Sequence, residues 1–453
     1  MKNVSPASTE TPNPTSISVA MLNRSTVMVL GFLLAAGNAL GQNTFHGSLT
    51  RTGVYDSTGL VQLNGVKWAF KTGGPVLSSP AVAEGVIYFG SADGFFYAVD
   101  EQSGKEKWKL EAGQPISSSP AVVEGMVYFT CYDRMLYAVA AQTGKVKWRF
   151  AAEQERSFQA SGIHGSTPRD QMIADPFDFF TSSPAVFHGR VYFGSGDGNI
   201  YAVDVETGAL VWRSPTGDVV HATPAIANNT VYIGSWDSNF YAIDATSGQE
   251  KWRFKAGEDP VDHNQVGFES SAAIWENTVY VGCRDGHVYA IDAATGRKKW
   301  DYSTSHSWVN TTPAVRDGTV FAGTCDSHQF FALEAKTGRL QHVLDAKQCM
   351  VSSPVIAGTV VYIGGFNGKL YALDTGSLKI LWEFQTNGSK QDPLNVLNSD
   401  GTRRPFTPTF NDYEDMVLLK YRTFSVGAIL STPVIDGGEV YFGSTDGYLY
   451  ALR

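Results

Sequence analysis

Carboxylates, imidazoles and aromatic rings gather in stretches of the chain that depart from an otherwise regular pattern. One stretch contains Gly162-Ile163-His164-Gly165 and the run from Asp175 to Phe180, and another contains Asp262, His263 and Glu269. The regular part of the chain adds the polar and aromatic residues His221, Arg284, Trp236, Trp308 and Asn310. Together they could bind an oxygen-rich ligand or a cation. For any single residue the alternative is ordinary loop chemistry, in which Asp and His stabilise turns and Phe fills a channel.

The spacing of these residues matches none of the common catalytic or metal-binding motifs. A Gly-x-Ser-x-Gly elbow, a phosphate-binding loop and an Asp-x-Asp-x-Asp-Gly calcium loop are all missing from the sequence. No pair of carboxylates is singled out for glycoside hydrolysis. The Asp-Gly pairs at Asp93, Asp197, Asp285 and Asp446 recur at regular intervals, which indicates hairpin turns. We therefore predict no metal site.

The regular pattern is a unit that occurs eight times. It reads Ser-Ser-Pro-Ala-Val, a turn, Val-Tyr-Phe-Gly-Ser, Asp-Gly, Tyr-Ala-Val-Asp, Thr-Gly and Lys-Trp. Its proline position is filled by Pro80, Pro120, Pro184, Pro224, Ala272, Pro313, Pro354 and Pro433. The basic spacing of about 40 residues is typical of one four-stranded propeller blade.

The repeat predicts an all-β fold, an eight-bladed β-propeller of four-stranded antiparallel blades. The last copy ends at Arg453 after its third strand. We expect the segment from Val66 to Phe70 to supply the missing outer strand, so that an N-terminal strand closes the ring and removes the open sheet edges. The small residues of the Ser-Ser-Pro-Ala stretch suit the crowded axis.

A tryptophan recurs in the outer strand of the unit. The positions are Trp68, Trp108, Trp148, Trp212, Trp252, Trp300 and Trp382, and His342 takes the place in the sixth copy. We predict that each ring docks one blade onto the next, which contributes about 2–3 kcal/mol per ring. A ligand-stacking set is the alternative, but repetition at the blade period favours structure.

Three insertions interrupt the repeat, at about 151–181, 257–269 and 386–428. All three join an outer strand to the next inner strand, and these connections lie on one face of a propeller. Insertions gathered on one face usually mark the binding side. We therefore expect one elaborated face over the mouth of the channel.

The N-terminal region carries an export signal. Arg24, the apolar run from Val27 to Ala36 and Ala39-Leu40-Gly41 have the order of a signal peptide. We expect residues 1–41 to be an N-terminal extension with this signal, 42–64 a lead-in segment and 65–453 the propeller. The protein should be periplasmic or secreted, without a transmembrane segment, and a monomer. Its net charge of −9 argues against a nucleic-acid partner.

Export permits disulfides among the four cysteines. Cys325 and Cys349 both fall near the elaborated face, and they are our preferred pair, with Cys283–Cys325 as the second choice. A free, buried thiol is the better expectation for Cys131.

The units resemble the pyrroloquinoline-quinone (PQQ) repeat family through the motif Ala-x-Asp-x-x-Thr-Gly-x-x-x-Trp. It stands at Ala98–Trp108, Ala202–Trp212, Ala242–Trp252 and Ala290–Trp300, with Ser103 and Ser247 in place of Thr in the first and third of these. The family includes non-catalytic propellers, such as the periplasmic scaffold of outer-membrane β-barrel assembly, and quinoprotein dehydrogenases. The resemblance implies an exported binding or scaffold protein that holds a protein or small-molecule ligand on the elaborated face.

The alternative implied by the resemblance is a PQQ- and Ca²⁺-dependent alcohol or sugar dehydrogenase. Such enzymes often hold the quinone between a Trp and a ring of adjacent cysteines, with Glu, Asn and Asp on Ca²⁺ and an Asp as base. This chain has no adjacent cysteines and no haem motif. Under this alternative the base candidates are Asp262, Asp285 and Asp326. The cofactor-binding candidates are Trp236, Trp308, Arg284, His221 and His263.

Overall fold

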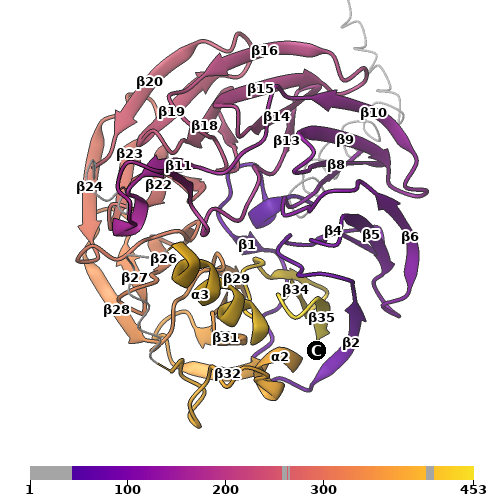
Figure 1. Cartoon of the computed structure of the whole chain (residues 1–453), viewed down its shortest axis with the longest axis vertical. Helices are drawn as coiled ribbons and strands as arrows, with labels where there is room; N and C mark the ends of the chain where they lie inside the picture. Colours follow the sequence, from indigo (N-terminus) through magenta and orange to yellow (C-terminus); the bar gives the residue numbers. More distant parts are fainter. Residues whose placement is uncertain (1–42, 258–262, 264–265, 405–412) are drawn as a thin grey trace, which may run out of the picture. The chain divides into compact units, whose positions relative to one another are not determined.

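The computed structural model describes residues 43–257, 263, 266–404 and 413–453. Gly41–Arg453 is the second of two units into which the chain divides. The second unit is an eight-bladed β-propeller of four-stranded antiparallel sheets (Figure 1). No helix among the described residues is long and apolar enough to cross a membrane.

The first four blades follow the first four copies of the repeat. Blade 1 contains β3 (Ala81–Ala83), β4 (Val86–Gly90), β5 (Phe95–Asp100) and β6 (Glu106–Glu111). Blade 2 contains β7 (Ala121–Val123), β8 (Met126–Thr130), β9 (Met135–Ala140) and β10 (Val146–Ala151). Blade 3 contains β13 (Ala185–Phe187), β14 (Arg190–Gly194), β15 (Asn199–Asp204) and β16 (Leu210–Pro215). Blade 4 contains β17 (Ala225–Ala227), β18 (Thr230–Gly234), β19 (Asn239–Asp244) and β20 (Glu250–Lys255).

The remaining blades continue the same order. Blade 5 contains β21 (Ala272–Trp275), β22 (Thr278–Cys283), β23 (His287–Asp292) and β24 (Lys298–Ser303). Blade 6 contains β25 (Ala314–Arg316), β26 (Thr319–Gly323), β27 (Gln329–Glu334) and β28 (Leu340–Asp345). Blade 7 contains β29 (Val355–Ala357), β30 (Val360–Gly364), β31 (Lys369–Asp374) and β32 (Ile380–Gln385). Blade 8 combines β33 (Val434–Asp436), β34 (Glu439–Gly443) and β35 (Tyr448–Leu452) with β2 (Val66–Lys71) from the other end of the unit.

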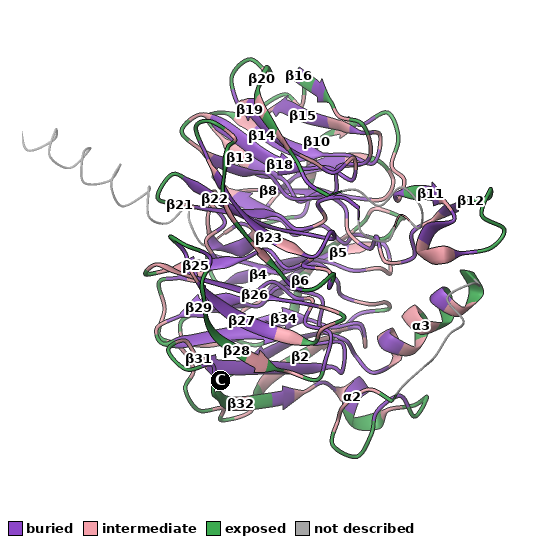
Figure 2. Ribbon diagram, turned by 90° about the vertical axis from the view of Figure 1, so that its left-hand side faces the viewer, coloured by how far each residue is buried: buried purple, intermediate pink, exposed green. Residues whose placement is uncertain are grey.

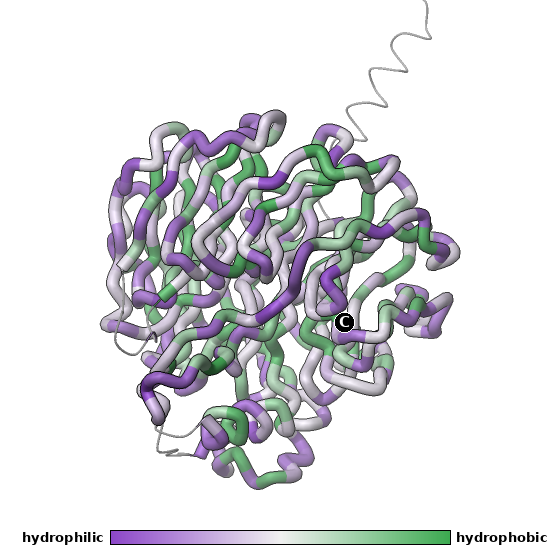
Figure 3. Tube along the Cα trace, turned by 45° about the horizontal axis from the view of Figure 1, so that its top comes forward, coloured by the Kyte–Doolittle hydropathy of each residue, from purple (hydrophilic) through white to green (hydrophobic). Residues whose placement is uncertain are grey.

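Burial follows position within a blade. In blade 1 the three inner strands are almost wholly buried, whereas β6 alternates between exposed and half-buried residues. Hydrophobic residues accordingly run along the strands, while the connections are more hydrophilic (Figure 3). The outer strand of every blade also carries a register shift just before the tryptophan position. Such bulges increase the local twist of a strand.

Each tryptophan of the repeat joins neighbouring segments. Trp108 Nε1, for example, donates a hydrogen bond of 2.8 Å to Ala141 O in the following blade. The same ring lies over the glycine of that blade's Thr-Gly turn, since a Cβ on Gly144 would come within 2.5 Å of Trp108. The last ring differs, because Trp382 Nε1 donates to Leu60 O in the lead-in segment. The glycine and tryptophan of the motif are therefore two sides of one contact between blades.

A ring of hydroxyl groups surrounds the axis. The residue before each opening proline, or before Ala272 in the fifth copy, is Ser or Thr. In six blades its hydroxyl accepts a hydrogen bond from the equivalent amide of the preceding blade. These bonds, of 2.8–3.3 Å, pass from Ser79 to Ser119, Ser119 to Ser183, Ser183 to Thr223, Thr223 to Ser271, Thr312 to Ser353 and Thr432 to Ser79. The small polar residues of the repeat thus hold the inner strands together.

The lead-in segment runs through the middle of the ring. The backbone oxygens of Asn43, Leu49, Thr50, Thr52 and Gly53 accept bonds from the inner strands of blades 2, 4, 5, 6 and 7. The segment forms the short helix η1 (Phe45–Gly47) and then β1 (Val54–Tyr55), which pairs in parallel with β29. It closes the channel on the side opposite the insertions.

The remaining elements among the described residues belong to the insertions. The first contains β11 (Gln159–Ser161), the short helix η2 (Ile163–Gly165) and β12 (Met172–Ala174). The third contains α2 (Asn387–Gln391) and α3 (Tyr413–Ser425). Figure 2 shows β11, β12, α2 and α3 projecting from the same face of the propeller, which we call the insertion face.

Candidate functional site

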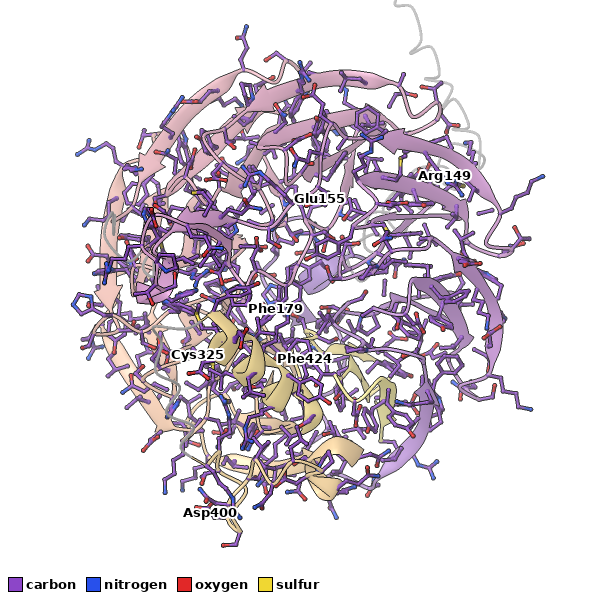
Figure 4. All side chains as sticks on the ribbon, viewed as in Figure 1. Arg149, Glu155, Phe179, Cys325, Asp400 and Phe424 are labelled. Atoms are coloured by element: carbon purple, nitrogen blue, oxygen red, sulfur yellow. A yellow bond between two sulfur atoms is a disulfide. The ribbon has the colours of Figure 1, made fainter. Side chains whose placement is uncertain are left out.

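A cavity of about 520 Å³ lies in the channel beneath the insertion face. Phe45 of the lead-in segment and the axial hydroxyls border it below, while Phe177, Phe179 and Phe424 come from the first and third insertions. The rings of Phe179 and Phe424 are 5.5 Å apart, and Figure 4 shows both near the axis. This volume lies in the range of small-molecule binding sites.

A buried ionic cluster forms one wall of the cavity. The His221 Nδ1 atom lies 2.7 Å from Asp178 Oδ1, and its Nε2 atom lies 2.8 Å from Glu155 Oε1. Burial disfavours the imidazolium, but the two carboxylates outweigh burial and raise the pKa of His221 to about 10. His221 is therefore a cation at neutral pH and is already paired on both sides.

Arg284 lies in the same wall, between two indole rings. Its Cζ atom is 3.7 Å from the ring centre of Trp308 and 4.6 Å from that of Trp236. Its Nη1 atom donates to Asp175 Oδ2 at 2.6 Å, and His164 Nε2 lies 3.1 Å from the other oxygen of Asp175. Despite burial, Arg284 and His164 hold the pKa of Asp175 below its ordinary value.

Several polar atoms around this wall are buried and lack a hydrogen-bond partner among the described residues. They are Glu269 Oε2, Trp308 Nε1, Asn310 Oδ1, and Nε and Nη2 of Arg284. Glu269, Trp308 and Asn310 line the cavity itself. Burial raises the pKa of Glu269 to about 8, although Arg284 opposes the shift. At neutral pH this wall therefore offers a neutral carboxyl group, an amide oxygen and an indole N–H.

The third insertion adds two cations to the cavity. Lys420 Nζ lies 5.0 Å from the ring centre of Phe179, and Arg403 Cζ lies 5.7 Å from that of Phe366. Burial lowers the pKa of both groups, that of Arg403 to about 10. The cavity is thus more basic than the acidic protein as a whole.

The site residues predicted from the sequence lie in different parts of the propeller. His221, Trp308 and Asp326 line the cavity, whereas Trp236 is buried behind it against Phe158. His263 is not among the lining residues. Asp262 lies outside the described residues.

The third base candidate, Asp285, serves a turn. Its Oδ2 atom accepts hydrogen bonds from Gly257 N and the Tyr289 hydroxyl, and its Oδ1 atom accepts one from His287 N. The Asp-x-x-x-Tyr pair recurs in other blades, for example Asp93 with Tyr97. Among the described residues no group of three or more His, Cys, Asp or Glu side chains could hold a metal ion.

Cys325 and Cys349 form a disulfide that borders the cavity. The other two cysteines, Cys131 and Cys283, are free and buried.

Sequence reasoning missed several residues of the site. Phe45 belongs to the lead-in segment, which carries no repeat signature, and Glu155, Arg403 and Lys420 lie in insertions without a repeated counterpart. The one available signal was their position in insertions on the binding side, which marks a segment but not an individual side chain.

Comparisons with known proteins agree with the fold. A family model described as outer membrane protein assembly factor BamB matches residues 60–177, 164–311 and 273–393. No curated protein sequence matches the chain. BamB from Moraxella catarrhalis is 15% identical with a TM-score of 0.61, and the match covers 86% of this chain and 97% of that one.

Two solved structures of enzymes are similar in fold as well. Quinohemoprotein alcohol dehydrogenase from Comamonas testosteroni is 14% identical with a TM-score of 0.65, covering 95% of this chain and 82% of that one. A europium-containing methanol dehydrogenase is 13% identical with a TM-score of 0.65, covering 93% and 100%. At these identities the likeness concerns the fold alone. The three matched segments together span most of the propeller, so this chain belongs to the PQQ-repeat propeller family whose model is described as outer membrane protein assembly factor BamB.

Proposed function

We propose that this protein is a non-catalytic, periplasmic binding propeller that holds a partner protein on its insertion face. The proposal rests on the apolar residues exposed on the outer side of α3. There Val417, Leu418 and Tyr421 are 41%, 44% and 64% exposed, and Met172 on β12 is 60% exposed. Exposed apolar residues grouped in this way often mark protein-binding surfaces.

The other side of α3 is apolar too. Met416 is fully buried, and Leu419 and Phe424 line the cavity. A helix that is apolar on both sides is normally covered on both sides. We propose that a partner protein binds to α3 and covers its outer side.

The description of the matching family model suggests which kind of partner protein binds. The matching family model is described as outer membrane protein assembly factor BamB, and one similar structure is a BamB. We propose that the partner of this chain is a periplasmic component of the machinery that assembles outer membrane proteins, which agrees with the export signal expected from the sequence.

The test is binding of the mature protein to that purified machinery, measured by biolayer interferometry. Leu418→Glu and Tyr421→Glu should each weaken binding at least tenfold, because a charge on the helix would have to be desolvated in the complex. The matched control is Leu340→Glu on the outer strand β28, where the side chain is 39% exposed. Failure of the wild type to bind, or equal binding by all variants, would exclude this function.

A PQQ- and Ca²⁺-dependent dehydrogenase is the second candidate, favoured by the unpartnered atoms of the cavity wall. Glu269 and Asn310 offer oxygen atoms that suit Ca²⁺, and Arg284 offers N–H groups that suit a carboxylate. Trp308 and the Cys325–Cys349 disulfide border the same cavity. The donor set fits in part, because Glu269 is a neutral carboxyl group at neutral pH and Arg284 covers one face of Trp308.

When bound, PQQ would supply a two-electron acceptor for alcohol oxidation. In that case Glu269 and Asn310 would hold the cation, Arg284 would orient the cofactor, and Asp326, which lines the cavity, is the base candidate best placed to accept a proton. Calorimetric titration with PQQ and Ca²⁺, followed by a dye-linked alcohol and sugar oxidation assay, tests this candidate. Micromolar binding with dye reduction would favour the dehydrogenase, and no binding would exclude it.

A further inference from the structure

The lead-in segment places an arginine inside the propeller without a carboxylate partner. The side chain of Arg51 is fully buried. Its Nε atom donates to Pro224 O at 3.1 Å, and its Nη1 atom donates to Thr44 Oγ1 at 2.8 Å and to Phe45 O. All three acceptors are neutral, and Arg51 forms no ion pair with a described residue.

The neighbouring side chains supply no counter-charge, although Arg51 Cζ lies 5.7 Å from the ring centre of Phe45. Burial lowers the pKa of His46 to about 4, and its two ring nitrogens contact Arg51 O and Pro354 O, so the ring is neutral. Burial raises the pKa of Tyr55, so its phenol is also neutral. Burying an uncompensated charge is costly, because the charge gives up its hydration without gaining a counter-charge.

Two hydrogen-bond donors at this position lack an acceptor. The Arg51 Nη2 and Tyr55 hydroxyl atoms are both buried and make no hydrogen bond. Both residues lie beside the turn around η1, and their side chains interact electrostatically. Arg51 Nη1 binds Thr44 and Phe45, and the Tyr55 Cζ atom lies 3.5 Å from the position that a Cβ on Gly47 would take.

We propose that Arg51 and Tyr55 hold one small monovalent anion, chloride in the cell, below the floor of the cavity. The anion would accept the two free N–H and O–H bonds and supply the missing negative charge. A water molecule could satisfy the two donors, but it would leave the charge of the guanidinium uncompensated. The site is separate from the insertion face, so it does not depend on the proposed function.

The first experiment is a crystal of the mature protein grown with sodium bromide in place of chloride. An anomalous bromide peak within about 3.5 Å of both Arg51 Nη2 and the Tyr55 hydroxyl is the expected result. Density without anomalous signal at this position would identify a water molecule and overturn the proposal.

The second experiment measures thermal unfolding in solution at constant ionic strength. Replacing sodium gluconate by sodium chloride should raise the Tm of the wild type by about 2 °C or more, since a ligand of the folded state stabilises it by mass action. Tyr55→Phe, which removes one donor, should reduce that rise by at least half. In Tyr280→Phe, which loses a buried hydroxyl bonded to Ala335 O, the rise should be unchanged. A Tm that is equal in the two salts would refute the anion site, whether or not the variants fold.

Discussion

The pairing of His221 with two carboxylates makes the stability of the propeller depend on pH in a defined range. His221 contacts Asp178 and Glu155, and its side chain is 1% exposed, so water screens these contacts little. The perturbation that we consider is a rise in pH, with His221→Gln as the variant that removes the titrating group. Glutamine keeps a polar side chain of similar length but cannot become a cation.

Whether stability rises or falls with pH follows from the direction in which folding shifts the pKa of His221. The pKa of His221 rises from 6.5 to about 10 on folding. The stabilisation is therefore fully present below pH 6.5 and is lost as the pH rises through about 10. A tenfold change in proton affinity corresponds to about 1.4 kcal/mol, so the rise in the pKa of His221 from 6.5 to about 10 corresponds to on the order of 5 kcal/mol of unfolding free energy.

The assay is urea unfolding of the wild type and of His221→Gln between pH 6 and pH 9.5. The wild type should lose stability relative to the variant across this range. The difference between the two proteins contains His221 and its effect on Glu269, because burial raises the pKa of Glu269 to about 8 and the charge of His221 opposes that rise. His342→Gln, on the exposed outer strand β28, is the control and should follow the wild type. Parallel curves for the wild type and His221→Gln would refute the reasoning.

Two further predictions concern blade docking and the disulfide. Gly248→Ala should lower the unfolding free energy by about 3 kcal/mol or more, because the new Cβ would lie 2.7 Å from Trp212. Gly125 has the same φ of +74° but no neighbouring atom within 4 Å, so Gly125→Ala should lower the unfolding free energy by only about 1–2 kcal/mol. If urea unfolding showed equal losses of unfolding free energy for the two variants, the docking role of the tryptophan would be contradicted. Replacing both Cys325 and Cys349 by Ser should cost about 3 kcal/mol, since their disulfide closes a loop with a sequence separation of 24. A calorimetric Tm unchanged by this double substitution would show that the disulfide does not constrain the unfolded chain.

Much of the fold could be predicted because each copy of the repeat encodes its own blade. The turn glycines, the β-branched strands and the position of the tryptophan are local signals, and eight copies reinforce one another. The contact between Trp108 and Gly144 spans only adjacent copies, so the spacing of the motif implies it. The Asp285 carboxylate behaves as the Asp-Gly pattern predicted, as part of a hairpin turn.

The candidate site was less predictable, because its members come from segments without a repeated counterpart. Asp178 and Glu155 lie 43 and 66 residues from His221, and nothing in their local sequence indicates that both contact the same ring. Trp236 and Trp308 were equal candidates for stacking in the sequence. The structure places Trp308 at the cavity and buries Trp236 behind Arg284.

Local patterns repeated at a fixed spacing are enough to predict the number of blades, their strand order and the face that carries the insertions. Only the tertiary structure decided that the lead-in segment enters the channel, that Phe45 forms the floor of the cavity and that Arg51 is buried on the axis. The reason is physical. The space on the axis exists only after eight blades have closed into a ring. The lead-in segment binds there through backbone hydrogen bonds to five inner strands. Backbone groups are the same in every residue except proline, so these bonds leave no signature in the sequence.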